Sequence, residues 1–450
     1  MRTRFGTDGM RGIAGHPPLD PGTLYRLGRA LVAYLAESGA GAGAARICLG
    51  RDTRESCAWI EAALARGIRD GGGVPVAAGV LPTPGLALVT RELGFAAGLM
   101  ISASHNPYQD NGVKVFDASG SKLADAHEER LEQLLDGAGE PEGCPDLDPG
   151  TDDQSAALQE RYLEFLVRCC GGASLDGLAV VLDTAHGAAS RLAPAAFRRA
   201  GARVTTLGDA PDGRNINDGV GSLHPELMAA EVRRRGADIG FSFDGDADRC
   251  IAASRKGAIL DGDFALYYAG RALHRAGRLP GATVVSTVMS NLGLQKALES
   301  EGIRMLRAAV GDRYVLQAMR EGGYTLGGEQ SGHVIFMDQA PTGDGILTAL
   351  NLCRIWREGA GDLDAALAAI PHFPQRLDNI KVRSKPDIET HPVLSAAVRR
   401  AERELGADGR VVVRYSGTEP KARVMIEGPD RATVDRLVEE LVAIFRKELA

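Results

Sequence analysis

The sequence predicts an α/β protein made of three similar α/β domains followed by a smaller C-terminal α+β domain. A length of 450 residues suits three domains, give or take one, at about 100 to 200 residues per domain. A pattern of short apolar strand, turn, amphipathic helix and second strand occurs three times along the chain. After about residue 371 this order changes, which indicates a last domain of a different kind.

Each copy of the pattern alternates strands and helices and ends in a polar loop. The strands are predicted at 47–49, 74–80 and 96–102 in the first copy, at 178–182, 203–208 and 237–243 in the second, and at 283–286, 303–308 and within 324–333 in the third. The helices are predicted at 59–68, up to Ala200, at 226–235, at 292–302 and after Asp312. Gly201 is expected to end its helix, because glycine adopts the left-handed conformation at little cost.

Alternating strands and helices predict mainly parallel sheets with right-handed crossovers, and such sheets bind ligands beyond the carboxyl ends of their strands. Three polar loops lie at such ends: SASHNP at 102–107, DGDADR at 244–249 and GEQSGH at 328–333. We therefore expect the three loops to meet in one central cleft.

The domain boundaries are predicted at 1–145, 154–252, 253–370 and 371–450. Residues 137–153 are rich in Gly, Pro and Asp, as is typical of a linker, and the prolines at 371 and 374 mark a second boundary. Beyond them we expect a strand at 379–383, a helix at 391–405, a hairpin at 411–428 and a final helix.

Composition excludes several classes of function. The chain has 52 Lys and Arg against 59 Asp and Glu, and the net charge of −7 argues against binding to nucleic acid or to an anionic membrane. No stretch approaches about 18 consecutive apolar residues, and the N-terminus lacks the apolar core of a signal peptide. The 7 cysteines form no CxxC pair, which favours reduced thiols. We expect a cytoplasmic protein.

The DGDADR loop predicts a magnesium site. Asp244, Asp246 and Asp248 alternate, so an extended backbone places their carboxylates on one side, where a hard cation would offset their repulsion. A calcium EF-hand fails, because Arg249 and Arg255 stand where it needs Gly and Glu. The alternative is a solvated acidic turn. The guanidinium of Arg249 could stabilise the charge on a transferring phosphoryl group. The alternative is an ion pair that only neutralises the aspartates.

Ser104 in SASHNP is a candidate phosphoryl carrier. A serine hydrolase is disfavoured, because the chain has no GxSxG elbow. Taken alone, a serine here is more often a turn or cap residue, but a hydroxyl facing a magnesium site could carry a phosphoryl group. Lys114 is a candidate proton shuttle, with a solvated surface lysine as the alternative.

Two further segments predict binding to a sugar phosphate. The hairpin at 411–428 combines two guanidiniums, hydroxyls and flexible amides around its turn, which favours an anion cradle over a plain surface hairpin. Its candidate residues are Arg414, Ser416, Gly417, Thr418 and Arg423. The GEQSGH loop offers hydrogen-bonding groups for sugar hydroxyls, namely Glu329, Ser331 and His333.

Taken together, the motifs resemble the α-D-phosphohexomutases, and within them the bacterial phosphoglucosamine mutases. The motifs occur in family order over essentially the whole chain: FGTDGMRG, GRDTRES, SASHNPYQDNGVKVF, FDGDADRC, VGDRYV, GGEQSGH and RYSGTEPKARVMIEG. The resemblance implies four domains around a deep cleft. It also implies a phosphorylated Ser104 and one Mg²⁺ per subunit, held by Asp244, Asp246 and Asp248 and by the phosphate on Ser104.

The resemblance implies a mechanism as well. The enzyme would interconvert glucosamine 6-phosphate and glucosamine 1-phosphate through a glucosamine 1,6-bisphosphate that turns over in the cleft, as a step toward UDP-N-acetylglucosamine. Arg11, Lys114 and Arg249 match positions assigned to charge stabilisation and proton transfer, and His333 matches another site residue. The ligand would be a small sugar phosphate, and the assembly considered is a homodimer.

Three details of sequence favour glucosamine as the sugar. SASHNP, Gln330 and the VGDRYV loop resemble the glucosamine branch. A protonated substrate amine would favour a carboxylate neighbour, and Glu329 or Asp312 could serve. The alternatives are a phosphomannomutase or phosphoglucomutase and, in another class, a non-catalytic sugar-phosphate sensor. Lys421 and Tyr415 depart from the branch pattern within the predicted phosphate cradle.

Overall fold

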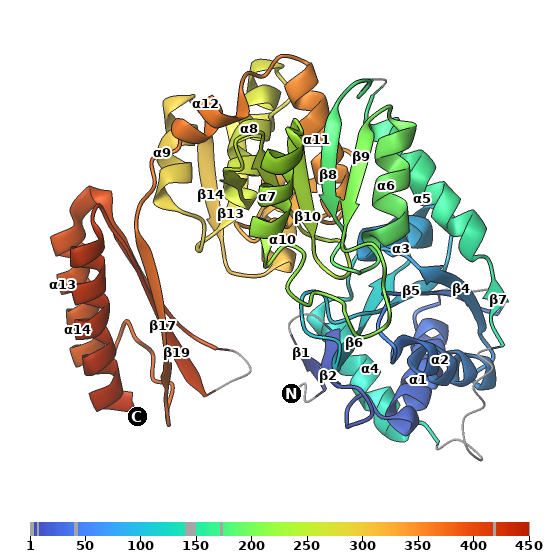
Figure 1. Cartoon of the computed structure of the whole chain (residues 1–450). Helices are drawn as coiled ribbons and strands as arrows, with labels where there is room; N and C mark the ends of the chain where they lie inside the picture. The colour runs from blue at the N-terminus through green and yellow to red at the C-terminus, as the bar shows by residue number, and fades with distance from the viewer. Residues whose placement is uncertain are drawn as a thin grey trace.

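The computed structural model describes residues 4–6, 9–39, 44–139, 150–171, 174–416 and 420–449, and their four sheets are shown in Figure 1. The first sheet has the order β1-β2-β6-β5-β3-β4-β7. Its elements are β1 (Phe5–Gly6), β2 (Gly9–Ile13), α1 (Pro21–Glu37), β3 (Arg46–Arg51), α2 (Cys57–Asp70), β4 (Val74–Val80), α3 (Thr83–Glu92), β5 (Ala97–Ile101), β6 (Asp110–Asp117), α4 (Asp125–Gly137) and β7 (Asp152–Asp153).

The second and third sheets repeat the central part of the first, with orders β12-β11-β10-β8-β9 and β14-β13-β15-β16. The second region contains α5 (Ser155–Cys169), β8 (Ala179–Asp183), α6 (Ala189–Arg199), β9 (Arg203–Leu207), α7 (Pro225–Arg235), β10 (Ile239–Phe243), β11 (Cys250–Ser254) and β12 (Ile259–Leu260). The third contains α8 (Gly262–Arg275), η1 (Pro280–Ala282), β13 (Thr283–Thr287), α9 (Leu292–Ser300), β14 (Arg304–Ala308), α10 (Asp312–Gly322), β15 (Leu326–Gly328), β16 (Val334–Phe336), α11 (Gly345–Arg357) and α12 (Leu363–Ala368).

The predicted triplication is confirmed, with one addition. In each sheet three parallel strands stand side by side, as expected, and the polar loop follows the strand at their edge: β5, β10 or β15. The strand after each loop returns antiparallel, as β6, β11 and β16 do. A short loop can join only antiparallel neighbours, because a parallel return needs a long crossover. Gly201 has φ +99°, as a helix-ending glycine should.

Two strands differ from the predicted domain organisation, one in the predicted linker and one across a predicted boundary. β7 pairs with β4, although its residues fall in the segment predicted to be a linker. β11 runs past the boundary predicted between 252 and 253, and its partner β12 ends at Leu260. β7 and β12 are the edge strands of their sheets and pair over two residues each, and such short segments show no periodicity in the sequence.

The last domain is smaller and built differently, as predicted. Its three-stranded antiparallel sheet has the order β17-β19-β18. The elements are β17 (Gln375–Lys381), α13 (Pro392–Leu405), η2 (Gly406–Asp408), β18 (Arg410–Tyr415), β19 (Lys421–Glu427) and α14 (Arg431–Leu449).

The apolar cores show which domains are joined. One core runs from α3 and α5 through α6 and β10 to α8 and α11, so it links the first three domains. The last domain has a core of its own, formed by β19, α13 and α14. Figure 1 shows this domain standing to one side of the other three.

Two further expectations concern composition. No helix in the described part of the chain is long and apolar enough to cross a membrane. The cysteines among the described residues are all free, at positions 48, 57, 169, 170, 250 and 353.

Candidate active site

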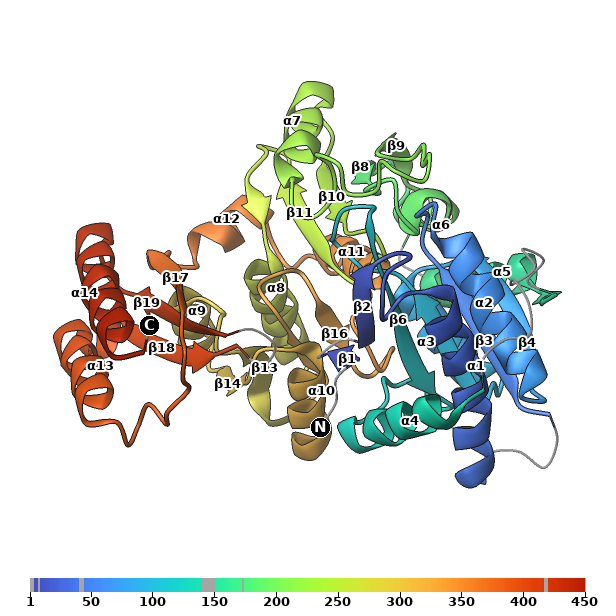
Figure 2. The same cartoon turned by 90° about the horizontal axis from the view of Figure 1, so that it is seen from below.

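A cleft of about 790 Å³ collects side chains from all four domains. Figure 2 shows the β18–β19 hairpin pointing toward β1 and α10. The predicted site residues that line the cleft are Arg11, Asp248, Arg249, Glu329, His333, Arg414, Ser416 and Arg423. Ser104, Lys114, Asp244 and Asp246 are buried directly behind the lining residues His105 and Asp248. The predicted convergence of the three loops is therefore present in the structure.

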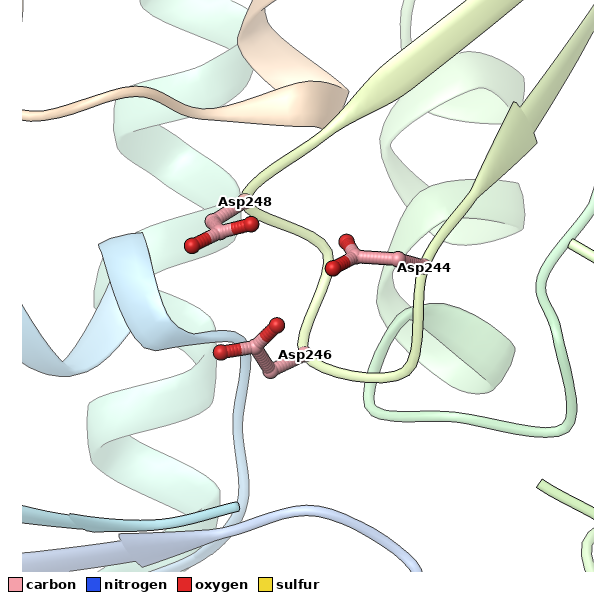
Figure 3. A group of neighbouring side chains, drawn as sticks. All are labelled: Asp244, Asp246 and Asp248. Carbon is pink, nitrogen blue, oxygen red and sulfur yellow. The ribbon is translucent and has the colours of Figure 1, made fainter. Parts of the chain in front are cut away.

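The three aspartates of the metal loop lie in the turn between β10 and β11, and their carboxylates face one another (Figure 3). One ligand oxygen from each lies within 4.8 Å of the others. The loop turns sharply, because Ala247 adopts φ +57° and Gly245 packs against the first domain. A Cβ at position 245 would lie 2.5 Å from the carbonyl oxygen of Ser104, so only glycine fits there.

Burial makes this carboxylate cluster electrostatically costly. Burial and the charges of Asp248 and Asp246 raise the pKa of Asp244 well above its usual range. Burial also acts against ionisation of Asp248, but the positive charge of Lys114, with His333 and Arg249, outweighs it and holds the pKa of Asp248 well below its usual range. A divalent cation would relieve the repulsion among the three groups.

The aspartates fit a hard cation such as Mg²⁺. Oδ1 of Asp246 and Oδ1 of Asp248 are buried and have no hydrogen-bond partner in the described structure. Buried carboxylate oxygens without a partner are costly, and oxygen donors are the ligands that Mg²⁺ prefers.

Ser104 contacts the metal loop directly. Its side chain is 1% exposed, and its Oγ donates to Oδ2 of Asp244 at 2.5 Å. The backbone at Ser104 adopts φ +53°, which is uncommon for a residue other than glycine. His105 Nδ1 lies 3.3 Å from Ser104 Oγ. Burial and the charges of Arg249 and Arg11 lower the pKa of His105 to about 4, so this imidazole is neutral at pH 7.

Lys114 projects from β6 into the same cluster. Its Nζ donates to Asp246 Oδ2 at 2.7 Å and lies 3.8 Å from Asp248 Oδ2. The alternative of a solvated surface lysine is wrong, because the side chain is buried. Thr83, at the start of α3, also donates to Asp246 Oδ2.

Arg249 and His333 connect the metal loop to the cleft. Arg249 Nη1 lies 3.1 Å from His105 Nδ1, and Arg249 Nε lies 3.8 Å from Asp248 Oδ1. His333 lies between two carboxylates, with Nδ1 3.7 Å from Asp248 Oδ2 and Nε2 3.9 Å from Asp312 Oδ2. Burial opposes protonation of His333, but the nearby carboxylate of Asp248, with those of Asp312 and Glu329, outweighs it and raises the pKa of His333.

The GEQSGH loop at 328–333, which was predicted to bind the sugar, places Glu329 in the cleft and Ser331 outside it. Glu329 lines the cleft, and its Oε1 accepts a hydrogen bond from Gly311 N at 3.2 Å. Asp312 also lines the cleft and pairs with Lys122 Nζ at 2.6 Å. Ser331 is exposed and is not among the lining residues.

The last domain faces the cleft with positive charge. Arg414 in β18 and Arg423 in β19 are cross-strand neighbours, and burial together with Arg423 lowers the pKa of Arg414. Ser416 is buried at the tip of the hairpin and lines the cleft. Gly417 and Thr418 lie outside the described residues.

Several cleft residues were not predicted from the sequence. His105, Lys122, Arg313 and Tyr314 line the cleft together with the predicted set. His105 lies within the SASHNP motif and could have been found there, because it is adjacent to Ser104. Arg313 and Tyr314 lie within VGDRYV, a motif that carried the resemblance but indicated no chemistry for these two side chains. Lys122 lies in no motif, and only the packing of the first domain against the third brings it to the cleft.

Models of all four domains of one family match the chain. Phosphoglucomutase/phosphomannomutase alpha/beta/alpha domain I matches residues 2–142, domain II residues 160–257, domain III residues 261–373 and the C-terminal domain residues 377–444. The chain belongs to the phosphoglucomutase/phosphomannomutase family. The predicted membership of the phosphohexomutases and the predicted four-domain architecture are confirmed, and the chain is a mutase of this family.

Curated relatives of this phosphohexomutase cover its whole length. A phosphoglucosamine mutase of Symbiobacterium thermophilum is 47% identical over 100% of both chains. A phosphoglucosamine mutase of Sorangium cellulosum is 44% identical over 100% of this chain and 94% of its own length.

Solved structures share the fold of this phosphohexomutase. A phosphoglucomutase/phosphomannomutase family protein from Burkholderia thailandensis has a TM-score of 0.78 and 24% identity, and the match covers 99% of this chain and 97% of that one. An N-acetylphosphoglucosamine mutase from Aspergillus fumigatus, in complex with GlcNAc-6P and magnesium, has a TM-score of 0.63 and 18% identity over 99% of this chain and 96% of its own.

Proposed function

We propose that this phosphohexomutase is a phosphoglucosamine mutase that interconverts glucosamine 6-phosphate and glucosamine 1-phosphate. The observation that carries the proposal is the contact between Ser104 Oγ and Asp244 Oδ2 at 2.5 Å, behind a cleft whose far wall is formed by Arg414 and Arg423. A nucleophilic hydroxyl beside a metal loop, with an anion cradle opposite, suits a substrate that carries a phosphate at each end during the reaction.

Ser104 carries the phosphoryl group in the resting enzyme under this proposal. The bond between phosphorus and Ser104 Oγ breaks as a sugar hydroxyl attacks, and the hydroxyl gives up its proton. The product is glucosamine 1,6-bisphosphate. After the sugar turns around, Ser104 Oγ attacks the other phosphate, and the released sugar oxygen takes up a proton. Phosphate, charge and protons balance over the cycle, and no other co-substrate is consumed.

The chain's own residues hold charge and protons at defined atoms. Lys114 Nζ, beside Asp246 and Asp248, is placed to return a proton to the serine side of the reaction. Arg249 and Arg11 line the cleft near Ser104 and balance the charge of the transferring group. Mg²⁺ bound by Asp244, Asp246 and Asp248, and by the phosphate on Ser104, would supply further positive charge to the phosphoryl oxygens.

Substrate binding is divided between two domains in this proposal. Glu329 and His333 contact the sugar, and Ser331 would have to reach it through a movement of its exposed loop. Arg414, Ser416, Gly417, Thr418 and Arg423 bind the phosphate that is not reacting. Because the sugar loop can hold the hexose in either orientation, the same cradle can hold either phosphate.

The choice of glucosamine rests on relatives and on charge. The phosphoglucosamine mutases of Symbiobacterium thermophilum and Sorangium cellulosum are full-length relatives. The carboxylates of Glu329 and Asp312 both line the cleft, where they can attract a protonated amine. We place the reaction in the synthesis of UDP-N-acetylglucosamine, in the cytoplasm, where the free cysteines of the described chain would stay reduced. A homodimer is part of the proposal.

The test compares three substrates. Purified enzyme with Mg²⁺, primed with the matching sugar bisphosphate, is assayed with glucosamine 6-phosphate, glucose 1-phosphate and mannose 1-phosphate. We expect kcat/KM to favour glucosamine phosphate by about 100-fold, near 2.7 kcal/mol. Equal or better turnover of the neutral hexoses would assign the enzyme to phosphomannomutase or phosphoglucomutase activity, and turnover of none would indicate a sensor.

A further inference from the structure

A fully buried guanidinium lies beneath the Ser104 loop. Arg54, between β3 and α2, has no exposed side-chain surface, and its Nε donates to Asp52 Oδ2 at 2.9 Å. Its Nη2 donates to the carbonyl oxygens of Ser104 at 3.0 Å and Asn106 at 2.8 Å. Its Nη1 donates to carbonyl oxygens farther along the chain, at Pro107 and Asp110. All of its backbone acceptors therefore belong to the loop that carries Ser104 or to Asp110, the first residue of β6.

A second donor reaches the same two carbonyl oxygens from another domain. Asn217, in the loop between β9 and α7, donates from Nδ2 to Ser104 O at 2.9 Å and to Asn106 O at 3.0 Å. Asn217 is itself held in place, since its backbone N donates to Ala185 O at 2.9 Å. Arg54 of the first domain and Asn217 of the second domain thus donate hydrogen bonds to the same two carbonyl oxygens.

One of these two carbonyl groups belongs to Ser104, whose backbone is strained. Ser104 has φ +53°, and a conformation of this kind costs on the order of 1 to 3 kcal/mol unless its surroundings enforce it. Its backbone N–H donates to Ser102 Oγ at 2.9 Å, and Ser102 Oγ donates to Asp52 Oδ2 at 2.6 Å. Because Asp52 also pairs with Arg54, both sides of the Ser104 peptide unit depend on one buried ion pair.

We propose that Arg54 and Asn217 are positioning residues that hold Ser104 in this left-handed conformation, so that its Oγ stays beside Asp244 throughout phosphoryl transfer. Neither side chain lines the cleft. They act through the backbone of Ser104, and their loss should therefore slow transfer more than it weakens substrate binding. This inference rests on the proposed function, because it assigns a role in phosphoryl transfer to Ser104.

The experiment compares Asn217→Ala and Asn217→Asp with a matched control. An aspartate at this position keeps the size of asparagine but, when ionised, cannot donate to the two carbonyl oxygens. The control is Arg214→Ala, which removes the exposed ion pair between Arg214 and Glu55, another contact between the same two domains. Arg54→Lys is the fourth variant, because lysine keeps the charge but not the planar fork. Each variant is primed with the sugar bisphosphate and assayed for kcat, KM, phosphate on Ser104 by intact-mass spectrometry, and thermal unfolding.

We expect both Asn217 variants to lose about 10-fold in kcat, and Arg54→Lys about 100-fold, as small displacements of a reacting group do. KM should stay within about twofold, and Arg214→Ala should resemble the wild type. If the Asn217 variants keep the wild-type kcat, the proposal is wrong. It is also wrong if kcat, recalculated per phosphorylated Ser104, is unchanged while unfolding shifts, which would indicate a role in stability alone. Failure of the wild type to acquire phosphate on Ser104 would instead overturn the proposed function, which separates the two conclusions. Should Arg54→Lys not fold, the Asn217 pair decides the matter.

Discussion

Arg410 and Glu427 lie opposite each other at one end of the β18–β19 hairpin, with Arg410 Nε 2.5 Å from Glu427 Oε2. The other end of the hairpin holds Arg414 and Arg423 in the cleft. Arg410 also donates to Val288 O at 2.6 Å, and Glu427 accepts from Leu292 N at 2.9 Å. One pair of strands therefore connects the contacts of the last domain with the third to the proposed phosphate cradle.

Replacing Glu427 by glutamine should displace the proposed phosphate cradle formed by Arg414 and Arg423. The carboxylate is fully buried, and loss of its charge leaves Arg410 without its counter-ion at the junction of the third and last domains. We expect KM for the sugar phosphate to rise by about 10-fold, near 1.4 kcal/mol, with a smaller change in kcat. Small-angle X-ray scattering should report a wider distribution of shapes.

Asp408→Asn is the matched control for Glu427→Gln. It removes the exposed pair with Lys296 at the same junction, and exposed pairs contribute little. An unchanged KM in Glu427→Gln, or an equal change in the control, would contradict the role of the buried pair.

Replacing Ser104 by alanine should remove the proposed phosphoryl carrier without unfolding the protein. We expect turnover to fall by about 1,000-fold or more, because alanine has no hydroxyl to carry the phosphoryl group. Thermal unfolding should stay within a few degrees of the wild type, since the two side chains are similar in size. Near-normal turnover in this variant would overturn the phosphoserine mechanism.

Amide substitutions at Glu329 and Asp312 should alter the choice of sugar. Both carboxylates line the cleft, so Glu329→Gln and Asp312→Asn each remove a negative charge that a protonated amine would face. We expect KM to rise more for glucosamine phosphate than for glucose phosphate, by about 10-fold. Glucose phosphate serves as the internal control, and equal effects on both sugars would rule out recognition of the amine by these groups.

Removal of Mg²⁺ should be visible in stability as well as in turnover. The carboxylates of Asp244, Asp246 and Asp248 repel one another, so a bound cation stabilises the folded state. At 100 times its Kd, Mg²⁺ should add about 2.7 kcal/mol to the free energy of unfolding. In Asp244→Asn, the added Mg²⁺ should produce a much smaller thermal shift. An identical shift in this variant would place the cation elsewhere.

The raised pKa of Asp344 predicts that the stability of the protein depends on pH. This side chain caps α11 and accepts a hydrogen bond from Tyr162 at 2.9 Å, and burial raises its pKa to about 7. Because this folded-state pKa lies above the ordinary value of an aspartate, the folded protein binds the proton more tightly than the unfolded chain does. The resulting stabilisation is fully present below about pH 4 and is lost as pH rises toward 7.

Asp344→Asn should remove that dependence. Between pH 4 and 7 the free energy of unfolding of the wild type should fall relative to the variant by on the order of 2 to 4 kcal/mol, measured by urea denaturation. Asparagine can still cap the helix, so both proteins should fold. Parallel stability curves for the two proteins would show that Asp344 does not titrate in this range.

The chain order of strands, helices and polar loops could be predicted, because hydrophobic periodicity is a local property. The chemistry of Asp244, Asp246 and Asp248 could be predicted as well, since three alternating carboxylates have few uses without a cation. Ser104 was ambiguous from its neighbours alone. Only its assumed proximity to the metal loop, and the family resemblance, favoured a nucleophile over a turn residue.

By itself, the sequence determined the four-domain α/β architecture and the three polar loops that meet at the cleft. The tertiary structure decided which of those residues meet. Lys114 lies beside Asp246 although 132 positions separate them, and Asn217 reaches Ser104 across 113 positions. It also decided that Ser331 is exposed and that the strand after each loop returns antiparallel. Such contacts depend on how whole domains pack, and the free energy of that packing is spread over a shared core that no short segment of sequence encodes.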